Sequence, residues 1–258
     1  MDIPSLFTLE GKVALVTGGS RGIGRMIAEA YLSAGATVYI TARKAEACEA
    51  AAKELGPHCI AVPGDISTLA GIRRLVDMLG ERESRLDILV NNAGAAWTAP
   101  LDSFPESGWD KVMDLNVKSP FFLIQSLLPM LRASRKPAKI INIASIDGQR
   151  ISPWEVYSYM TSKAALLHLT RRLAAELARE EIIVSALAPG PFPSEMNRAA
   201  IDDRDNLAKI VPLGRIGEAE DIAGAAIFLA ARAGDYVVGS ALTVDGGIVA
   251  STFAGSIE

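Results

Sequence analysis

The sequence predicts a single α/β domain of the Rossmann type, with a doubly wound parallel sheet of seven strands, and three observations support this prediction. Short apolar runs alternate with longer segments of helical periodicity along the whole chain. The first apolar run leads into a glycine-rich turn and then into a helix. The length of 258 residues suits one large domain, here residues 1–258. Helical crossovers between the strands predict the order 3-2-1-4-5-6-7.

Each strand and helix is predicted from the local pattern of apolar residues. The runs that we interpret as strands are 13–17, 37–41, 59–62, 86–91, 138–143, 182–187 and 241–244. The helical segments are one that ends before Gly35, then 44–55, 68–83, 107–133, 155–180 and 218–232. An irregular stretch follows the sixth strand. Because ligands bind such sheets at the carboxyl ends of the strands, we expect a substrate lid at about 189–217.

The composition excludes several classes of protein. Hydrophobic residues make up 50% of the chain, which argues against disorder, and a net charge of −4 without a basic stripe argues against a nucleic-acid partner. No apolar stretch approaches the roughly 18 residues that span a bilayer, and the N-terminus has no signal-peptide pattern. The 2 cysteines and 2 histidines are too few for a zinc site or a disulfide framework. We therefore expect a soluble, cytoplasmic protein without a metal.

A glycine-rich turn predicts a dinucleotide-binding site. Gly18, Gly22 and Gly24 directly follow the first strand and precede the first helix. Glycines in this context let the main chain approach a diphosphate closely, and the helix N-terminus supplies N–H donors. The alternative is a structural turn that binds no ligand.

Basic residues near this turn favour NADP(H) over NAD(H). An NAD-specific site usually has an Asp or Glu about 20 residues past the glycines, where it binds the ribose 2′-hydroxyl. Here the second strand is followed by Arg43 and Lys44, and no acid lies at 41–44. Arg43 and Arg21 both suit a 2′-phosphate, because a guanidinium donates two parallel charge-assisted hydrogen bonds. The alternative is that Arg43 is a solvated residue at the start of the next helix.

Three residues in the middle of the chain predict the reaction centre. Ser145 follows the fifth strand, while Tyr159 and Lys163 are four residues apart in one predicted helix and share a face. A lysine one turn away is expected to lower the tyrosine pKa, normally about 10, and so to make it a usable acid or base. Tyr159 would give its proton to a carbonyl oxygen as hydride reaches the carbon, with Ser145 hydrogen-bonded to that oxygen. Tyr157 lacks a lysine at this spacing, so we expect a wall or packing role for it.

Together these motifs resemble the short-chain dehydrogenase/reductase family over nearly the whole chain. The resemblance rests on 17–24, Asp65-Ile66, Asn91-Asn92-Ala93-Gly94, Asn116, Pro189-Gly190 with Ser194, and 244–247. It implies that Asn116 joins Ser145, Tyr159 and Lys163 in a catalytic tetrad, where it positions a water near the lysine. It also implies that Lys163 holds the nicotinamide ribose. The cofactor site that it implies comprises Gly18, Ser20, Arg21, Gly22, Ile23, Gly24, Arg43, Asp65, Ile66, Asn92, Ala93, Gly94, Tyr159, Lys163, Pro189, Gly190 and Ser194.

Within this family the sequence resembles NADPH-dependent 3-oxoacyl-(acyl-carrier-protein) reductases of the rhamnolipid-biosynthesis type. Segments 107–117 and 188–196 carry this narrower resemblance. It implies that 3-oxoacyl thioesters are reduced to 3-hydroxyacyl thioesters, and the wider family implies a homotetramer. The Ser145–Tyr159 separation is one residue longer than is typical of the family, so we expect a reshaped loop between them, with Asp147, Arg150 and Trp154.

Apolar side chains on loops near the site predict a pocket for an acyl chain. The candidates are Trp97, Trp154, Phe192 and Met196, and packing beneath its loop is the alternative for each of them. A basic cluster after the helix 107–133 is a candidate docking site for an acidic carrier protein. This cluster comprises Arg132, Arg135 and Lys136, and its alternative role is a favourable interaction with the helix dipole.

Two other functions stay open at this point. The same chemistry is compatible with a polyol, a sugar or a cyclic alcohol as substrate, a choice that the lid and the tryptophans would decide. A non-catalytic sensor that binds NADP(H) and regulates a partner is also compatible with the fold. Such a sensor would have no need of the four tetrad residues.

Overall fold

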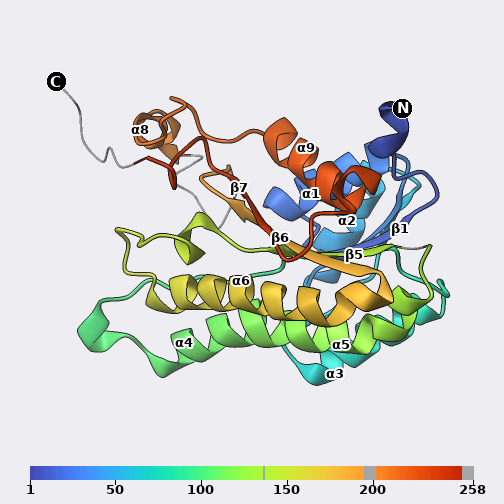
Figure 1. Ribbon diagram of the computed structural model, residues 1–258. Helices are drawn as coiled ribbons and strands as arrows, with labels where there is room; N and C mark the ends of the chain where they lie inside the picture. Colours follow the sequence, from blue (N-terminus) through green and yellow to red (C-terminus); the bar gives the residue numbers. More distant parts are fainter. Residues whose placement is uncertain (136, 195–201, 252–258) are drawn as a thin grey trace.

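The computed structural model describes residues 1–135, 137–194 and 202–251, and its centre is a seven-stranded sheet in the order β3-β2-β1-β4-β5-β6-β7 (Figure 1). The strands are β1 (Val13–Thr17), β2 (Thr37–Thr41), β3 (Cys59–Ala61), β4 (Ile88–Asn91), β5 (Ala138–Ile143), β6 (Ile182–Pro189) and β7 (Ala241–Val244). All neighbouring strands pair in parallel. The predicted fold class and strand order are therefore confirmed.

Helices cover both faces of the sheet. α1, α2 and α9 pack on one face, and α3, α5 and α6 pack on the other (Figure 1). The bounds are α1 (Gly22–Ser33), α2 (Ala45–Leu55), α3 (Leu69–Gly80), α4 (Glu106–Met113), α5 (Ser119–Arg132), α6 (Tyr157–Leu177), α8 (Arg204–Lys209) and α9 (Ala219–Ala230). Short 3-10 helices lie at Pro4–Leu6, Leu101–Ser103, Ile146–Gly148, Ala178–Glu180 and Arg232–Gly234. Within the described ranges, no helix is both long and apolar enough to cross a membrane.

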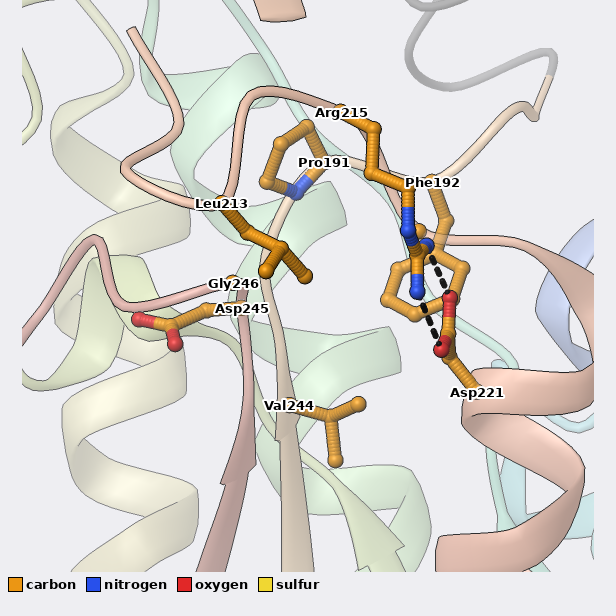
Figure 2. Close-up of a pocket in the computed structure, with 9 residues that line it drawn as sticks. Pro191, Phe192, Leu213, Arg215, Asp221, Val244, Asp245 and Gly246 are labelled. Atoms are coloured by element: carbon orange, nitrogen blue, oxygen red, sulfur yellow. Dashed lines mark hydrogen bonds and ion pairs between the residues drawn. The ribbon is translucent and has the colours of Figure 1, made fainter.

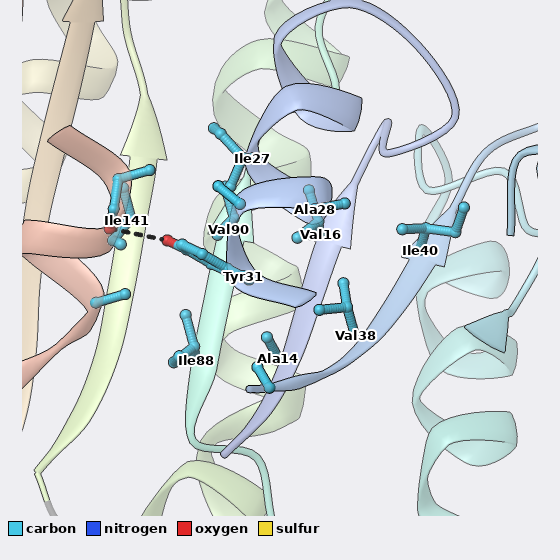
Figure 3. Close-up of a cluster of buried hydrophobic side chains, with 14 of the residues drawn as sticks. Ala14, Val16, Ile27, Ala28, Tyr31, Val38, Ile40, Ile88, Val90 and Ile141 are labelled. Carbon is cyan, nitrogen blue, oxygen red and sulfur yellow. Dashed lines mark hydrogen bonds between the residues drawn. The ribbon is translucent and has the colours of Figure 1, made fainter. Parts of the chain in front are cut away.

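A large apolar core lies between the sheet and α1. All residues of β1 are buried, which explains why its sequence is a continuous apolar run. Val16 of this strand and Tyr31 of α1 belong to the same buried cluster (Figure 3). The Tyr31 hydroxyl donates a hydrogen bond to the carbonyl of Ala226 in α9, 3.2 Å away. This bond ties the last turn of α1 to α9 on one face of the sheet.

The predicted helix 107–133 is interrupted. α4 and α5 are joined by a π-helical segment, η3 (Asp114–Lys118), and Asn116 is the buried residue of that segment. A π segment accommodates one extra residue in a helical turn and occurs frequently at functional sites. The pattern of apolar residues predicts one continuous helix here because the chain stays helical on both sides of the interruption.

A buried carboxylate ties together the amino ends of β1 and β4. Asp87 directly precedes β4 and is 0% exposed. One of its oxygens accepts a hydrogen bond from the Val13 N–H (2.9 Å), and the other accepts one from the Arg135 N–H (2.8 Å). Asp87 thus marks the amino edge of the sheet, opposite the carboxyl ends of the strands where the predicted site residues gather.

Candidate active site

The glycine turn lies tightly against the loop that follows β4. Gly18 has a φ of +65° and Gly22 a φ of +53°, backbone angles that residues with a Cβ rarely adopt. A Cβ on Gly18 would lie 3.0 Å from the Asn92 side-chain nitrogen, so the turn has no room for one. The main chain of the turn therefore packs directly against Asn92, beside the N-terminus of α1.

Thr17 and Asn92 lock this turn in place. The Thr17 hydroxyl accepts hydrogen bonds from the N–H groups of Asn92 (2.9 Å) and Ala93 (3.0 Å). The Asn92 side chain in turn donates to the Thr17 carbonyl oxygen, at 2.9 Å. These bonds join the ends of β1 and β4, so the predicted cofactor residues from the two motifs share one rigid edge.

Arg43 lies where its charge acts on Asp65. Arg43 is exposed after β2, and Asp65 is half-buried after β3. Burial raises the pKa of Asp65, but hydrogen bonds from Ser67 and the charges of Arg43 and Arg74 outweigh burial and lower that pKa. The Ser67 N–H donates to an Asp65 oxygen at 3.0 Å. The structure thus brings together an arginine and an acid that the sequence predicts at the adenosine end of the cofactor.

Ser145, Tyr159 and Lys163 come together at the carboxyl end of β5. Ser145 begins the 3-10 helix that follows this strand, and Tyr159 lies in the first turn of α6. The Tyr159 hydroxyl and the Ser145 side chain share a hydrogen bond. Lys163 is 4% exposed, and its Nζ lies 5.5 Å from the centroid of the Tyr159 ring. The same Nζ donates a hydrogen bond to the Ile143 carbonyl oxygen, 2.7 Å away.

Asn116 is connected to this group through α6. Its side-chain oxygen accepts from the Ala95 N–H at 2.8 Å, and its side-chain nitrogen donates to the Ala95 carbonyl at 2.9 Å. The same nitrogen donates to the Ser162 hydroxyl at 2.9 Å, one residue before Lys163. The π-helical turn presents Asn116 inward, so that it clamps the loop after β4 to the helix that carries the tyrosine and the lysine.

The structure corrects the expected pKa of Tyr159. Burial raises the pKa of this tyrosine to about 12; the hydrogen bond with Ser145 opposes that rise and the Asp147 carboxylate adds to it. Burial also lowers the pKa of Lys163 to about 8. The predicted lowering of the Tyr159 pKa by Lys163 is therefore wrong for this arrangement, because burial outweighs the effect of a lysine that is itself desolvated. A tyrosine with this pKa is protonated at neutral pH and suits the role of proton donor.

The segment after β6 meets both the glycine turn and the C-terminal turn. Gly190 follows Pro189, the last residue of β6, and its N–H donates to the Val244 carbonyl at 2.9 Å. A Cβ on Gly22 would lie 3.2 Å from the Ser194 Cβ, so this serine lies over the glycine turn. The predicted nicotinamide residues thus stand beside the predicted phosphate residues. Met196 lies outside the described residues.

Phe192 is part of the core at the base of the predicted lid. Its side chain is 2% exposed and packs so closely on Gly217 that a Cβ there would overlap the ring. Arg215 and Asp221 form an ion pair with a 2.9 Å hydrogen bond, and both line a small pocket together with Phe192 (Figure 2). We therefore assign Phe192 a packing role instead of the substrate contact that the sequence suggested.

The remaining aromatic candidates differ in their surroundings. The Trp97 ring packs on Gly108 of α4, and the Lys111 Nζ lies 5.3 Å from its centroid, so much of this side chain is engaged in packing. Trp154 is 65% exposed on the loop between Ser145 and α6. Tyr157 packs edge-on against Phe104, with ring centroids 5.8 Å apart, as expected of a packing residue.

The basic cluster lies at the wrong edge of the sheet for substrate delivery. Arg132 pairs with Glu180 through two hydrogen bonds, one of them 3.1 Å long. The Arg135 N–H donates to Asp87, which marks the amino edge. β5 spans six residues, or roughly 20 Å, from this edge to Ser145. The predicted carrier contact at Arg132 and Arg135 thus faces away from the tetrad, and Lys136 lies outside the described residues.

Three site residues were missed as such by the sequence analysis. Thr17 holds the loop after β4, Ser162 links Asn116 to α6, and Asp147 acts electrostatically on Tyr159. Ser162 lies inside the Tyr159–Lys163 spacing and Thr17 inside the glycine motif, but a spacing pattern does not reveal hydrogen bonds to distant segments. Asp147 was recognised only as part of a reshaped loop.

Known proteins resemble this chain in both sequence and structure. A protein-family model described as enoyl-(acyl carrier protein) reductase matches residues 18–249. The rhamnolipids biosynthesis 3-oxoacyl-[acyl-carrier-protein] reductase of Pseudomonas aeruginosa is 51% identical over 249 residues, covering 93% of this chain and 97% of that protein. The sorbitol dehydrogenase of Cereibacter sphaeroides is 39% identical over 251 residues, covering 93% of this chain and 98% of that protein. Among solved structures, the Pseudomonas aeruginosa RhlG/NADP active-site complex matches with a TM-score of 0.92 at 50% identity, covering 95% of this chain and 99% of that chain.

Proposed function

The chain belongs to the short-chain dehydrogenase/reductase family, and from this membership we propose that it is an NADP(H)-dependent carbonyl reductase acting on 3-oxoacyl thioesters, which it converts to 3-hydroxyacyl thioesters. The observation that carries the chemistry is the hydrogen bond between Tyr159 and Ser145, with Lys163 one helical turn away. The substrate class is supported by the relative that is 51% identical and is named a 3-oxoacyl reductase.

The residues at the carboxyl edge fit a bound NADP(H). Gly18 and Gly22 adopt positive φ angles and place the main chain beside the N-terminus of α1, where N–H groups suit a diphosphate. Arg43 and Arg21 would hold the 2′-phosphate, and the acid at 65 would face the adenosine. A relative of known structure was obtained with NADP, which supports the same choice. When bound, the cofactor supplies the hydride.

The chain itself supplies the proton and the orientation. Tyr159 is protonated at neutral pH, so its hydroxyl would donate a hydrogen bond to the substrate carbonyl oxygen and then its proton. Ser145 would hold the same oxygen by a second hydrogen bond. Lys163 is fixed by the Ile143 carbonyl and would present its remaining donors to the ribose beside it. Asn116 would complete the tetrad by holding the loop at Ala95 against α6.

The first test is the loss of NADPH absorbance with a panel of 3-oxoacyl thioesters, with NADH run in parallel. Turnover that is selective for NADPH and rises with acyl length would support both the cofactor and the substrate assignments. Silence across the panel, with NADPH still bound, would reject the thioester and move the search to sugars and alcohols.

A matched pair of variants tests the proton donor. Tyr159→Phe removes only a hydroxyl, and we expect turnover to fall by at least about 100-fold while NADPH binding is kept. Tyr157→Phe removes the same group from a residue packed on Phe104 and should retain turnover. Near-normal turnover of Tyr159→Phe would reject the assignment.

A polyol or sugar substrate is the second candidate. The sorbitol dehydrogenase at 39% identity supports it, as does the polar side chain of Asp147 beside Tyr159. Oxidation of a polyol panel with NADP⁺ would identify this activity. A purely regulatory protein is disfavoured, because the four tetrad residues are all present.

We also propose a homotetramer in the cytoplasm. Trp109 on α4 and Phe121 on α5 are 39% and 37% exposed, and such side chains suit an interface between copies of the chain. Light scattering of the purified protein would test the assembly, and a monomer would reject it. If an acyl carrier protein delivers the substrate, it must approach the carboxyl edge and not the basic residues at 132 and 135.

A further inference from the structure

The loop between Ser145 and α6 fixes the position of Asp147 beside the reaction centre. The Asp147 N–H donates to the Ser145 hydroxyl oxygen at 3.1 Å, within the 3-10 helix Ile146–Gly148. On its other side, a Cβ on Gly148 would lie 2.7 Å from the main-chain carbon of Lys163, so the loop is pressed directly onto α6. Asp147 is therefore held between two contacts with the tetrad and has little freedom to move away.

The Asp147 carboxylate is half-buried and keeps its partners close. Burial raises the pKa of this carboxyl group, while the Arg150 guanidinium and a hydrogen bond with Ser152 oppose that rise. The Ser152 side chain is itself buried, at 7% exposure. A half-buried carboxylate with a charged and a polar partner costs desolvation free energy that an apolar side chain would not cost. The loop thus retains a charge in a place where an acyl pocket would not need one.

The negative charge of Asp147 affects the pKa of the proposed proton donor, Tyr159. Asp147 raises the pKa of Tyr159, beyond the larger rise that burial causes. Arg150 lies on the same loop, and its charge acts on Asp147. Asp147 and Ser145 thus both act on the Tyr159 hydroxyl, while the Lys163 Nζ lies 5.5 Å from the centroid of the Tyr159 ring.

We propose that Asp147 is a specificity-determining residue that makes the site select neutral 3-oxo esters and thioesters and reject the free 3-oxo acid anion. The proposal rests on the proposed function and deepens it. In a 3-oxo acid the carboxylate is only two bonds from the reacting carbonyl carbon, so binding would bring two negative charges together near Tyr159. Asp147 already acts on the Tyr159 hydroxyl, and like charges repel more strongly in a partly buried site than in water. An ester or a thioester presents no charge there and avoids the repulsion.

The test compares a neutral 3-oxo ester with the matching free 3-oxo acid, as substrates of the NADPH-loaded enzyme. We expect the wild type to favour the ester in kcat/KM. In Asp147→Asn, which keeps the shape and removes the charge, the ester-to-acid ratio should fall by at least about tenfold. Glu155→Gln is the matched control, because it removes the same charge from an exposed position a few residues further along the loop. Its ratio should stay at the wild-type value.

Three kinetic outcomes would overturn the inference. The first is a wild-type preference for the acid, which would mean that Arg150 attracts the anion. The others are an unchanged ester-to-acid ratio in Asp147→Asn and an equal fall of that ratio in Glu155→Gln. Calorimetric binding of the ester and the acid to the NADP⁺ complex gives a second readout that needs no turnover. Binding of the acid should strengthen in Asp147→Asn, and failure of the ester to bind the wild type would also overturn the inference. Turnover of neither compound by a wild type that binds the ester would instead reject the proposed function.

Discussion

Replacement of Lys163 by methionine should reveal a pH-dependent cost of keeping a lysine in the site. Lys163 is 4% exposed, and burial lowers its pKa from 10.5 to about 8. Between these values the unfolded chain holds a proton on this lysine that the folded protein has lost. The unfolding free energy of the wild type should therefore rise with pH through this window, relative to a variant without the lysine.

The size of the effect follows from the two pKa values. The interval between 10.5 and about 8 is about 2.5 pH units, and each unit corresponds to about 1.4 kcal/mol. The wild type should thus gain about 3 kcal/mol over Lys163→Met between pH 8 and pH 10.5. The variant also loses the hydrogen bond to the Ile143 carbonyl. This loss adds a constant offset to the difference in unfolding free energy and leaves its change with pH as the signal.

The measurement is urea denaturation of both proteins, without cofactor, at several pH values across this window. All other titrating groups are common to the two chains, so the difference in unfolding free energy isolates the lysine. A difference that stays flat from pH 8 to 10.5 would refute the reasoning, because it would mean that Lys163 keeps an ordinary pKa when folded. The same variant should also lose turnover, because Lys163 belongs to the proposed tetrad.

Two further predictions concern the cofactor and the fold. Arg43→Ala should reduce the preference for NADPH over NADH by on the order of 10- to 100-fold, since a charge-assisted hydrogen bond is lost. Kd values of both cofactors measure this preference, with Lys44→Ala as the control at the neighbouring position. An unchanged preference in Arg43→Ala would contradict the prediction. Asp87→Ala should lower the unfolding free energy by about 3 kcal/mol or more, because the N–H groups of Val13 and Arg135 lose their buried acceptor. Denaturant midpoints measure this loss, and a change below about 1 kcal/mol would show that water replaces the carboxylate.

Much of the fold is predictable because the strands are buried on both faces. β1 and β5 are entirely buried, so both sequences are mainly apolar, although β5 also buries Lys139 and Asn142. The interruption of the helix 107–133 was not predictable from this pattern. An extra residue in one turn, as at Asn116, leaves apolar residues on both sides at nearly helical spacing.

The site was predictable where it depends on spacing along one element. Tyr159 and Lys163 share a helix face whatever surrounds them, and their neighbourhood with Ser145 follows from the parallel sheet. The direction of the Tyr159 pKa shift was not predictable, because it depends on burial by segments that are distant in sequence. Phe192 shows the same limit: an aromatic residue on a loop near the site contacts either substrate or core, and only its position beneath Gly217 decides.

The π-helical turn at Asp114–Lys118 makes chain length, more than side-chain identity, the sensitive property of this region. Loss of any one residue from it would restore a regular α-helix and turn α4 by about 100° relative to α5. That rotation would carry Gly108 away from the Trp97 ring and Asn116 away from Ala95. Substitutions in this turn that leave Asn116 in place should be tolerated far more often than single-residue deletions. The extra residue is therefore a built-in spacer, which sets two halves of a helix at different angles so that each meets its own neighbour.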